Sequence, residues 1–391
     1  MYFYKYLKAD NLSISMLRNG EVFFASPKEL NDAHECKPQF IFNADSEIWM
    51  RFIYDILSNV CLLLKLKPKS NLAYQILSFK DPLLLSILNN RKTKAIDYDT
   101  LLNKLKDSFG KEAIENLDFI DARNAIRAFN AYLQNDLDSK LNNSYYMTSF
   151  SKSATNLTMW GHYGNAEKGF AIIYESQDGN VNIESSIERF PSHQKTKEGT
   201  ILLGTSKHSS TPLIEVDYKN KPVRANGFRG LIPKFFYSNE ESDNDYSQDL
   251  LARIPEYDEN NIGRVKFTDW KYEKELRLHL PVYEELDPPL RCVKIASQHI
   301  KGVIFGSRTS DSDKRNILAA CYLLKKNQKK ETNLFVFQSR SVPSQYKINV
   351  TSIGKVCNIQ YNDSPYLERI NKKDVITKEE VYKITKEINA S

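Results

Sequence analysis

Short strand-forming runs stand near both ends of the sequence, each beside a helical pattern, and this arrangement constrains the fold more than any other feature. Residues 2–7 are rich in aromatic side chains, and LSISMLRNG after them predicts a helix that ends at Gly20. Near the other end, KGVIFGS, a helical pattern from Asp311 to Lys326 and NLFVFQS predict a β-α-β unit. The sequence therefore predicts an α+β fold with a mixed or antiparallel β core.

Two long segments between these ends have a different pattern. Residues 44–143 carry apolar side chains at spacings of three and four, which is typical of amphipathic helices, so we expect a large helical insertion there. Residues 176–262 are rich in polar and turn-forming residues, and we expect an irregular insertion. The result is a single domain over residues 1–350, followed by a C-terminal tail with a charged helix over 351–391.

The composition is that of a globular protein, with 41% hydrophobic residues and a formal charge of +6 from 55 basic and 49 acidic residues. That balance permits a nucleic-acid partner without requiring one. The five cysteines are scattered without the spacing of a zinc site. The most apolar run is too short to span a bilayer. We therefore expect a cytoplasmic protein that neither enters membranes nor holds a structural metal.

The segment WKYEKELRL, residues 270–278, is the sharpest signal of chemistry. As a strand it would place Glu273, Glu275 and Arg277 on one face, with Leu276 and Leu278 on the core-facing side. Two carboxylates this close to each other often give one carboxyl group a shifted pKa. The alternative is a solvent-exposed strand face that carries an ion pair.

A second block, TMWGHYG, crowds a tryptophan, a histidine and a tyrosine before a glycine turn. Trp160 and Tyr163 could form a wall against which a flat ring stacks. The pKa of a histidine side chain lies near neutrality, so His162 could exchange protons with a ligand. The alternative is that the aromatic residues anchor the core and that His162 is structural.

Two further blocks lie near the N-terminus. Tyr4, Lys5 and Tyr6 combine aromatic and basic side chains, which suits a nucleotide and equally suits an exposed edge strand. In NDAHE, residues 31–35, the pattern favours a turn or a helix cap. The adjacent His34 and Glu35 lack the spacing of a helical metal-binding motif.

In this order the blocks resemble a bacterial family called domain of unknown function twenty-nine seventy-one. The family pattern combines a Tyr-Lys-Tyr start, an Asn-Asp motif, a Met-Trp-x-x-Tyr motif and a Trp-x-x-Glu-x-Glu-x-Arg motif. The resemblance covers about residues 1–350. One departure is that Ala33 and His34 stand where the family has proline and a following aromatic residue. This resemblance implies no particular activity.

Shorter motifs resemble those of the ADP-ribosyltransferases. The Ser-Phe-Ser sequence at 149–151 is similar to their serine strand, which scaffolds NAD, and Glu273-x-Glu275 is similar to their glutamate strand. Lys5 stands where those enzymes carry arginine or histidine, and lysine cannot make the bidentate contact of arginine. The resemblance implies split sheets around the glutamate strand and NAD as substrate.

It further implies that Glu275 is the main catalytic carboxylate, with Glu273 and His162 beside it. The residues that it assigns to NAD binding are Tyr4, Lys5, Tyr6, Ser149, Ser151, Trp160, Tyr163 and Arg277. We therefore expect an NAD-dependent ADP-ribosyltransferase or another NAD-consuming effector, in bacterial phage defence or in a toxin system.

Two other classes of function remain open from the sequence. One is a sensor module that binds a nucleotide or nucleic acid without catalysis. The other is a metal-dependent nuclease that would use Asp32, Glu35, Glu273 and Glu275. The helices expected over residues 44–143 are compatible with a protein partner and with self-association into a homo-oligomer.

Overall fold

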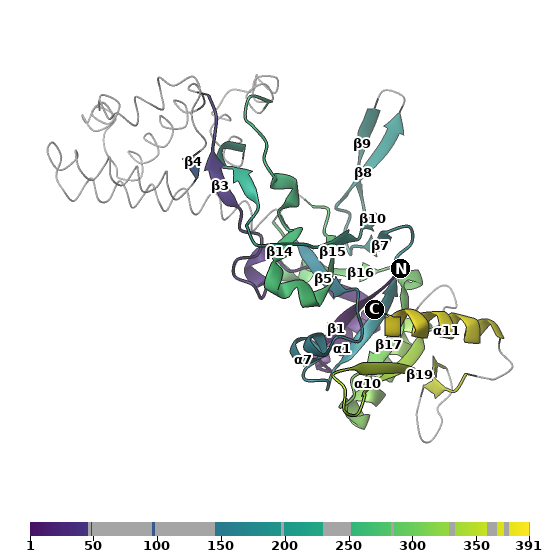
Figure 1. Cartoon of the computed structure of the whole chain (residues 1–391). Helices are drawn as coiled ribbons and strands as arrows, with labels where there is room; N and C mark the ends of the chain where they lie inside the picture. The colour runs from purple at the N-terminus through teal and green to yellow at the C-terminus, as the bar shows by residue number, and fades with distance from the viewer. Residues whose placement is uncertain are drawn as a thin grey trace, which may run out of the picture. The chain divides into compact units, whose positions relative to one another are not determined.

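The computed structural model describes residues 1–45, 48, 96–97, 145–196, 199–229, 252–282, 285–327, 333–357, 366–370 and 375–390 (Figure 1). The contacts divide the chain into two compact units, where the sequence predicted one domain. The first unit comprises Met1–Glu35, Asn143–Asn220 and Lys266–Ser391, and the second comprises Cys36–Asn142 and Lys221–Val265. The site described below lies within the first unit.

A nine-stranded mixed sheet organises the first unit, in the order β11-β15-β5-β1-β6-β17-β18-β19-β20. Its strands are β1 (Tyr2–Leu7), β5 (Met147–Ser151), β6 (Phe170–Glu175), β11 (Ile214–Glu215), β15 (Glu275–His279), β17 (Ile300–Phe305), β18 (Phe335–Ser341), β19 (Ile348–Val356) and β20 (Leu367–Glu368). Of the pairings described within this sheet, only β17 with β18 is parallel, and α10 (Asp311–Lys326) connects these two strands. The predicted β-α-β unit and the α+β class are confirmed.

Smaller sheets complete the described structure. A four-stranded sheet has the order β10-β7-β16-β2, formed by β10 (His208–Pro212), β7 (Asn180–Glu184), β16 (Cys292–Ile295) and β2 (Glu21–Phe23). The hairpin of β8 (Phe190–Thr196) and β9 (Gly199–Ser206) and the pair of β12 (Asp217–Lys219) with β14 (Val265–Phe267) are separate. In the second unit, β13 (Arg224–Asn226), β3 (Gln39–Phe42) and β4 (Ile96–Asp97) form a three-stranded sheet.

Two apolar cores lie on opposite faces of the nine-stranded sheet, because successive side chains of a strand point to opposite faces. On β1, Phe3 belongs to one core and Tyr4 to the other. The Phe3 core also receives side chains of the four-stranded sheet, of α10 and of α1 (Asn11–Asn19). The Tyr4 core receives Trp160 and two isoleucines of α11 (Val375–Ala390).

The first helix shows how the sequence sets its own boundaries. Asp10 precedes α1, and its carboxylate accepts a hydrogen bond from the backbone N–H of Ser13 at 2.8 Å. Gly20 ends the helix with a φ of 71°, a left-handed conformation that glycine adopts without steric cost. The predicted helix end at Gly20 is confirmed.

Several predictions about the longer segments need correction or lie outside the described residues. The described part of 176–262 contains the strands from β7 to β13 instead of an irregular insertion, because short strands with polar residues carry little apolar periodicity. The helical insertion predicted over 44–143 lies almost entirely outside the described residues. In the predicted tail, α11 buries Ile384 and Ile388 completely, so this charged helix is part of the fold. Within the described ranges, every helix is too short or too polar to cross a lipid bilayer.

Candidate functional site

A split in the nine-stranded sheet borders a cavity in the first unit. Along the whole of β1, every residue pairs with β6, whereas the described pairing of β1 with β5 is limited to Tyr4 with Ser151. Beyond that pair the two strands diverge, so residues 5–7 of β1 and 147–150 of β5 border the same space. The cavity therefore opens between two strands that are neighbours in the sheet order.

The cavity has a volume of about 430 Å³, which is in the range of small-molecule binding sites. Apolar side chains of α1, β2 and β5 form part of the wall, among them Leu12, Met16 and Phe23. Tyr163, Lys266, Glu273 and Glu275 also line it. The cavity thus combines an apolar wall with a group of ionisable side chains.

The carboxylates of the cavity come from a short helix and the strand that follows it. Residues Thr268–Glu273 form the 3-10 helix η3, and Lys274 ends it with a φ of 45° before β15 begins at Glu275. The predicted continuous strand over 270–278 is therefore wrong in its first half. The core-facing prediction for Leu276 and Leu278 is confirmed, since both are buried in the apolar core.

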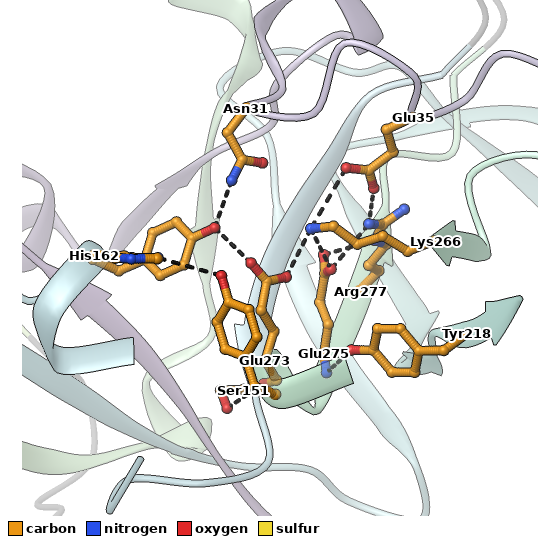
Figure 2. Close-up of polar contacts among 11 residues, drawn as sticks. Asn31, Glu35, Ser151, His162, Tyr218, Lys266, Glu273, Glu275 and Arg277 are labelled. Atoms are coloured by element: carbon orange, nitrogen blue, oxygen red, sulfur yellow. Dashed lines mark hydrogen bonds and ion pairs between the residues drawn. The ribbon is translucent and has the colours of Figure 1, made fainter. Parts of the chain in front are cut away.

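Lys266 lies at the centre of an ionic cluster formed by Glu35, Lys266, Glu273, Glu275 and Arg277 (Figure 2). Its ammonium nitrogen lies 2.7 Å from Glu273 Oε2, 3.1 Å from Glu275 Oε2 and 3.6 Å from Glu35 Oε2. The same ammonium lies 4.8 Å from the centre of the Trp270 ring. One buried cation therefore contacts all three carboxylates.

Arg277 is the second cation of the ionic cluster. Its Nε donates to Glu275 Oε1 at 2.7 Å, and its terminal nitrogen pairs with Glu35. All five side chains of the cluster are nearly inaccessible, and the guanidinium of Arg277 is fully buried. This excludes the alternative in which Glu273, Glu275 and Arg277 form a solvent-exposed strand face.

The charges of the ionic cluster do not balance when every group is ionised, because three carboxylates face two cations. Burial raises the pKa of Glu275 to about 7, against the opposing effect of the Lys266 ammonium. Burial acts to lower the pKa of Lys266, but the carboxylates of Glu275 and Glu273 outweigh it and hold this pKa above its ordinary value. Glu275 can therefore hold a proton near neutral pH.

Tyr163 connects the ionic cluster to the loop after β2. Its hydroxyl donates to Glu273 Oε1 at 2.6 Å and accepts from the side-chain amide of Asn31 at 2.6 Å (Figure 2). Burial and the hydrogen bond to Glu273 raise the pKa of the Tyr163 hydroxyl. Tyr163 follows the short helix α7 (Leu157–His162), whose first turn is capped by the side chain of Asn156. The expectation that Tyr163 lies at the cavity wall agrees with this geometry.

Two residues of the same block lie elsewhere. Trp160 is fully buried in the Tyr4 core and donates from Nε1 to the carbonyl oxygen of Ala154 at 2.8 Å. The expected stacking wall is therefore not formed by its indole ring. His162 is exposed, and its Nδ1 lies 3.3 Å from the hydroxyl of Tyr272, outside the cavity lining. An acid-base role for His162 within the cavity is not supported by this position.

The predicted serines and the first strand do meet at the cavity. The hydroxyl of Ser149 hydrogen-bonds Glu275, and that of Ser151 donates to the carbonyl oxygen of Glu273 at 2.6 Å. Lys5 extends across the split to β5, where its nitrogen lies 2.9 Å from both Thr148 Oγ1 and the Ser149 carbonyl oxygen.

Tyr4 and Tyr6 of β1 line the cavity and pack into the Tyr4 core at the same time. The Tyr6 hydroxyl donates to the carbonyl oxygen of Ser153 at 2.7 Å, and its ring meets Trp160 edge to face. The tyrosine rings therefore support the cavity from the core side.

Sequence reasoning did not find Lys266 and gave Asn31 only a turn or cap role. It gave Glu35 the same role or, in the nuclease alternative, a place around a metal ion. An isolated lysine between apolar neighbours is ordinarily exposed, so no local pattern marks Lys266 as buried.

His34 does make the expected turn, with its N–H donating to Asp32 Oδ1 at 2.9 Å. Among the described residues, no group of three or more histidine, cysteine, aspartate or glutamate side chains is arranged to hold a metal ion.

Fold and site together define an α+β protein with an ionic cluster beside a cavity in a split sheet. Residues 159–278 match the family model described as Protein of unknown function (DUF2971). The match includes the Met-Trp-x-x-Tyr and Trp-x-x-Glu-x-Glu-x-Arg motifs, which confirms the resemblance to this family over that segment. No curated protein and no solved structure matches the chain, so these comparisons give no support to an ADP-ribosyltransferase fold.

Proposed function

We propose that the cavity binds NAD and that the protein cleaves the bond between nicotinamide and ribose, passing ADP-ribose to water or to an acceptor. The observation that carries this proposal is the meeting of Glu273 and Glu275 with Lys5, Ser149 and Ser151 around one cavity. Glu275, Ser149, Ser151 and Lys5 come from three strands that are neighbours in the sheet, β15, β5 and β1, and Glu273 is the last residue of η3, just before β15.

The charge of the site suits this reaction. Departure of nicotinamide leaves positive charge on the ribose, and a carboxylate held nearby in a buried site stabilises that charge strongly. The ionic cluster has three carboxylates and two cations, so it favours an additional positive charge on a ligand. Glu275 would stabilise the ribosyl cation, and Glu273 would assist through its hydrogen bond with Tyr163.

The split between β1 and β5 also supports the proposal. The resemblance to ADP-ribosyltransferases implies split sheets around the glutamate strand. Here β15 pairs with β5 over five residues, while β5 separates from β1 after a single pair. A ligand between the strands would therefore contact backbone and side chains of all three.

A second candidate is a module that binds a nucleotide or nucleic acid without catalysis. It is favoured by the fact that both carboxylate oxygens of Glu275 already contact cations. A metal-dependent nuclease is less favoured, because the Lys266 ammonium already contacts the carboxylates of Glu35, Glu273 and Glu275.

The test is to incubate the purified full chain with NAD and to measure released nicotinamide by chromatography. The Glu275→Gln variant should release nicotinamide about 100-fold more slowly or worse. Glu184→Gln, the same change at an exposed position of β7, should match the wild type. If Glu275→Gln does not fold, Tyr163→Phe provides a variant that keeps every charge of the ionic cluster.

The outcomes separate the candidate functions. NAD binding by calorimetry without nicotinamide release would favour the binding module, and neither binding nor release would overturn the proposal. We further propose the setting implied by the sequence resemblance, an effector of phage defence or a toxin system. In that setting, expression of the wild type should lower cellular NAD, and expression of Glu275→Gln should not.

A further inference from the structure

Lys5 is a lysine whose side chain ends at the cavity wall instead of in solvent. It lies on β1 directly after Tyr4, the residue at which β1 and β5 part. Its side chain is half-buried, and its nitrogen lies 5.1 Å from the centre of the Phe150 ring. The amine therefore stands at the split itself, in contact with both diverging strands.

The partners of this amine are all uncharged. The nitrogen donates to Thr148 Oγ1 and to the carbonyl oxygen of Ser149, each at 2.9 Å. In the part of the chain that the structure describes, no carboxylate lies within ion-pair distance of it. The charged side chains that line the same cavity are Glu29, Glu35, Lys266, Glu273 and Glu275. Of these, Glu29 is paired with Arg291, and the others belong to the ionic cluster.

This set of partners suits a neutral amine as well as an ammonium. A neutral amine has two N–H groups, so it can keep both hydrogen bonds while its lone pair takes a third tetrahedral position. Burial lowers the pKa of Lys5 to about 8, against the opposing charge of Glu275. About one Lys5 side chain in ten is then neutral at pH 7, compared with fewer than one in a thousand for an ordinary lysine.

We propose that Lys5 is a nucleophilic amine that condenses with an aldehyde bound in the cavity. The neutral nitrogen attacks the carbonyl carbon, so that a C–N bond forms and the carbonyl oxygen takes up a proton. Loss of water from this carbinolamine gives an imine, and no oxidant or reductant is consumed. Glu275 lines the same cavity, and in its protonated form it would donate the proton that leaves with the water.

The choice of the aldehyde rests on the proposed function. Cleavage of NAD releases ADP-ribose, whose open-chain form carries an aldehyde at the carbon that held nicotinamide. Condensation with Lys5 would retain this product on the enzyme as a reversible self-modification. The inference itself requires only that the cavity admits an aldehyde and that Lys5 reaches it.

The experiment uses added ADP-ribose, so it does not depend on NAD cleavage. The full chain is incubated with ADP-ribose and cyanoborohydride at pH 7, and the reduced adducts are mapped by mass spectrometry. Lys5 should be modified at least about tenfold faster than Lys8, an exposed lysine of the same chain segment. Glyceraldehyde in a parallel reaction measures the reactivity of the amine without nucleotide recognition.

The Lys5→Arg variant keeps the positive charge and cannot form an imine, so the adduct at position 5 should disappear while adducts elsewhere remain. The pH profile of Lys5 modification should have its midpoint near 8. Modification of Lys5 no faster than Lys8 with both aldehydes would overturn the inference, and so would a midpoint near the ordinary lysine value. Selective modification of Lys5 by ADP-ribose without nicotinamide release from NAD would support this inference while contradicting the proposed function.

Discussion

The ammonium nitrogen of Lys266 lies 2.7 Å from a carboxylate oxygen of Glu273, and both side chains are almost completely buried. Lys266 lies in β14, and Glu273 is the last residue of η3, which follows β14 directly. Burial of a charge is unfavourable unless a partner compensates it, so this pair and the rest of the ionic cluster depend on one another.

Replacement of Lys266 by methionine should be strongly destabilising, because it removes the cation that all three carboxylates share and leaves Glu273 without a cation in the cluster. We expect a loss of about 3–5 kcal/mol in the free energy of unfolding, measured by urea denaturation with circular dichroism. Lys294→Met on β16 removes an exposed lysine and should change the stability by less than about 0.5 kcal/mol. Equal effects of the two substitutions would contradict the central role of Lys266.

Glu275 should make the stability depend on pH in a defined window. Its pKa is raised from 4.5 to about 7 in the folded protein, so folding favours the protonated carboxyl group. The resulting stabilisation is fully present below pH 4.5 and is lost as the pH rises to about 7, with an amplitude of about 1–3 kcal/mol. Urea denaturation from pH 4.5 to 8 should show this decline in the wild type.

The control for this pH dependence is Glu275→Gln, which cannot titrate and should lack the decline. Glu29 affects the stability in a lower pH range, because the hydrogen bond from Arg291 lowers the pKa of Glu29 to about 2. Stability from Glu29 is present above its ordinary pKa of 4.5 and is lost only as the pH falls toward 2. A decline between pH 4.5 and 7 that persists in Glu275→Gln would assign the effect to another group.

The Tyr163 hydroxyl should stabilise the protein through its two hydrogen bonds. Tyr163→Phe is expected to lower the free energy of unfolding by about 1–2 kcal/mol, because it removes the hydrogen bonds of Tyr163 with Glu273 Oε1 and with the side-chain amide of Asn31. A double-mutant cycle with Asn31→Ala should give a coupling energy of at least about 0.5 kcal/mol. Tyr382→Phe removes the hydroxyl of an exposed tyrosine of α11 and serves as the control.

Two glycines near α7 should respond oppositely to alanine. A Cβ atom at Gly306 would lie only 2.1 Å from the carbonyl oxygen of Glu167, so Gly306→Ala should destabilise by about 1–3 kcal/mol. Gly161 lies within α7 with no atom inside 4 Å of an added Cβ, and Gly161→Ala should be neutral or stabilising by up to about 1 kcal/mol. Thermal unfolding of the two variants checks the difference, and similar melting temperatures would contradict it.

The sequence predicted those parts of the site that follow from local periodicity. Alternation along 275–279 predicted that Leu276 and Leu278 face the core, and the strand confirms it. The same alternation failed for Glu273, because Lys274 takes a left-handed conformation that is uncommon for lysine and breaks the strand. Local pattern cannot anticipate such a break.

The long-range part of the site could not be predicted in the same way. Glu35 meets Arg277 across 242 positions of sequence, and no periodicity connects them. For Trp160, the sequence block TMWGHYG predicted either a cavity wall or a core anchor, and tertiary packing placed the side chain in the core. The strand order that places β5 between β1 and β15 was likewise beyond the reach of the sequence pattern.

The division of the chain into two units gives the ionic cluster a second significance. The chain passes into the second unit directly after Glu35 and returns from it, for the last time, at Lys266. The described residues that line the cavity all belong to the first unit. Glu35 and Lys266 are therefore at once members of the ionic cluster and end residues of the segments that build the first unit.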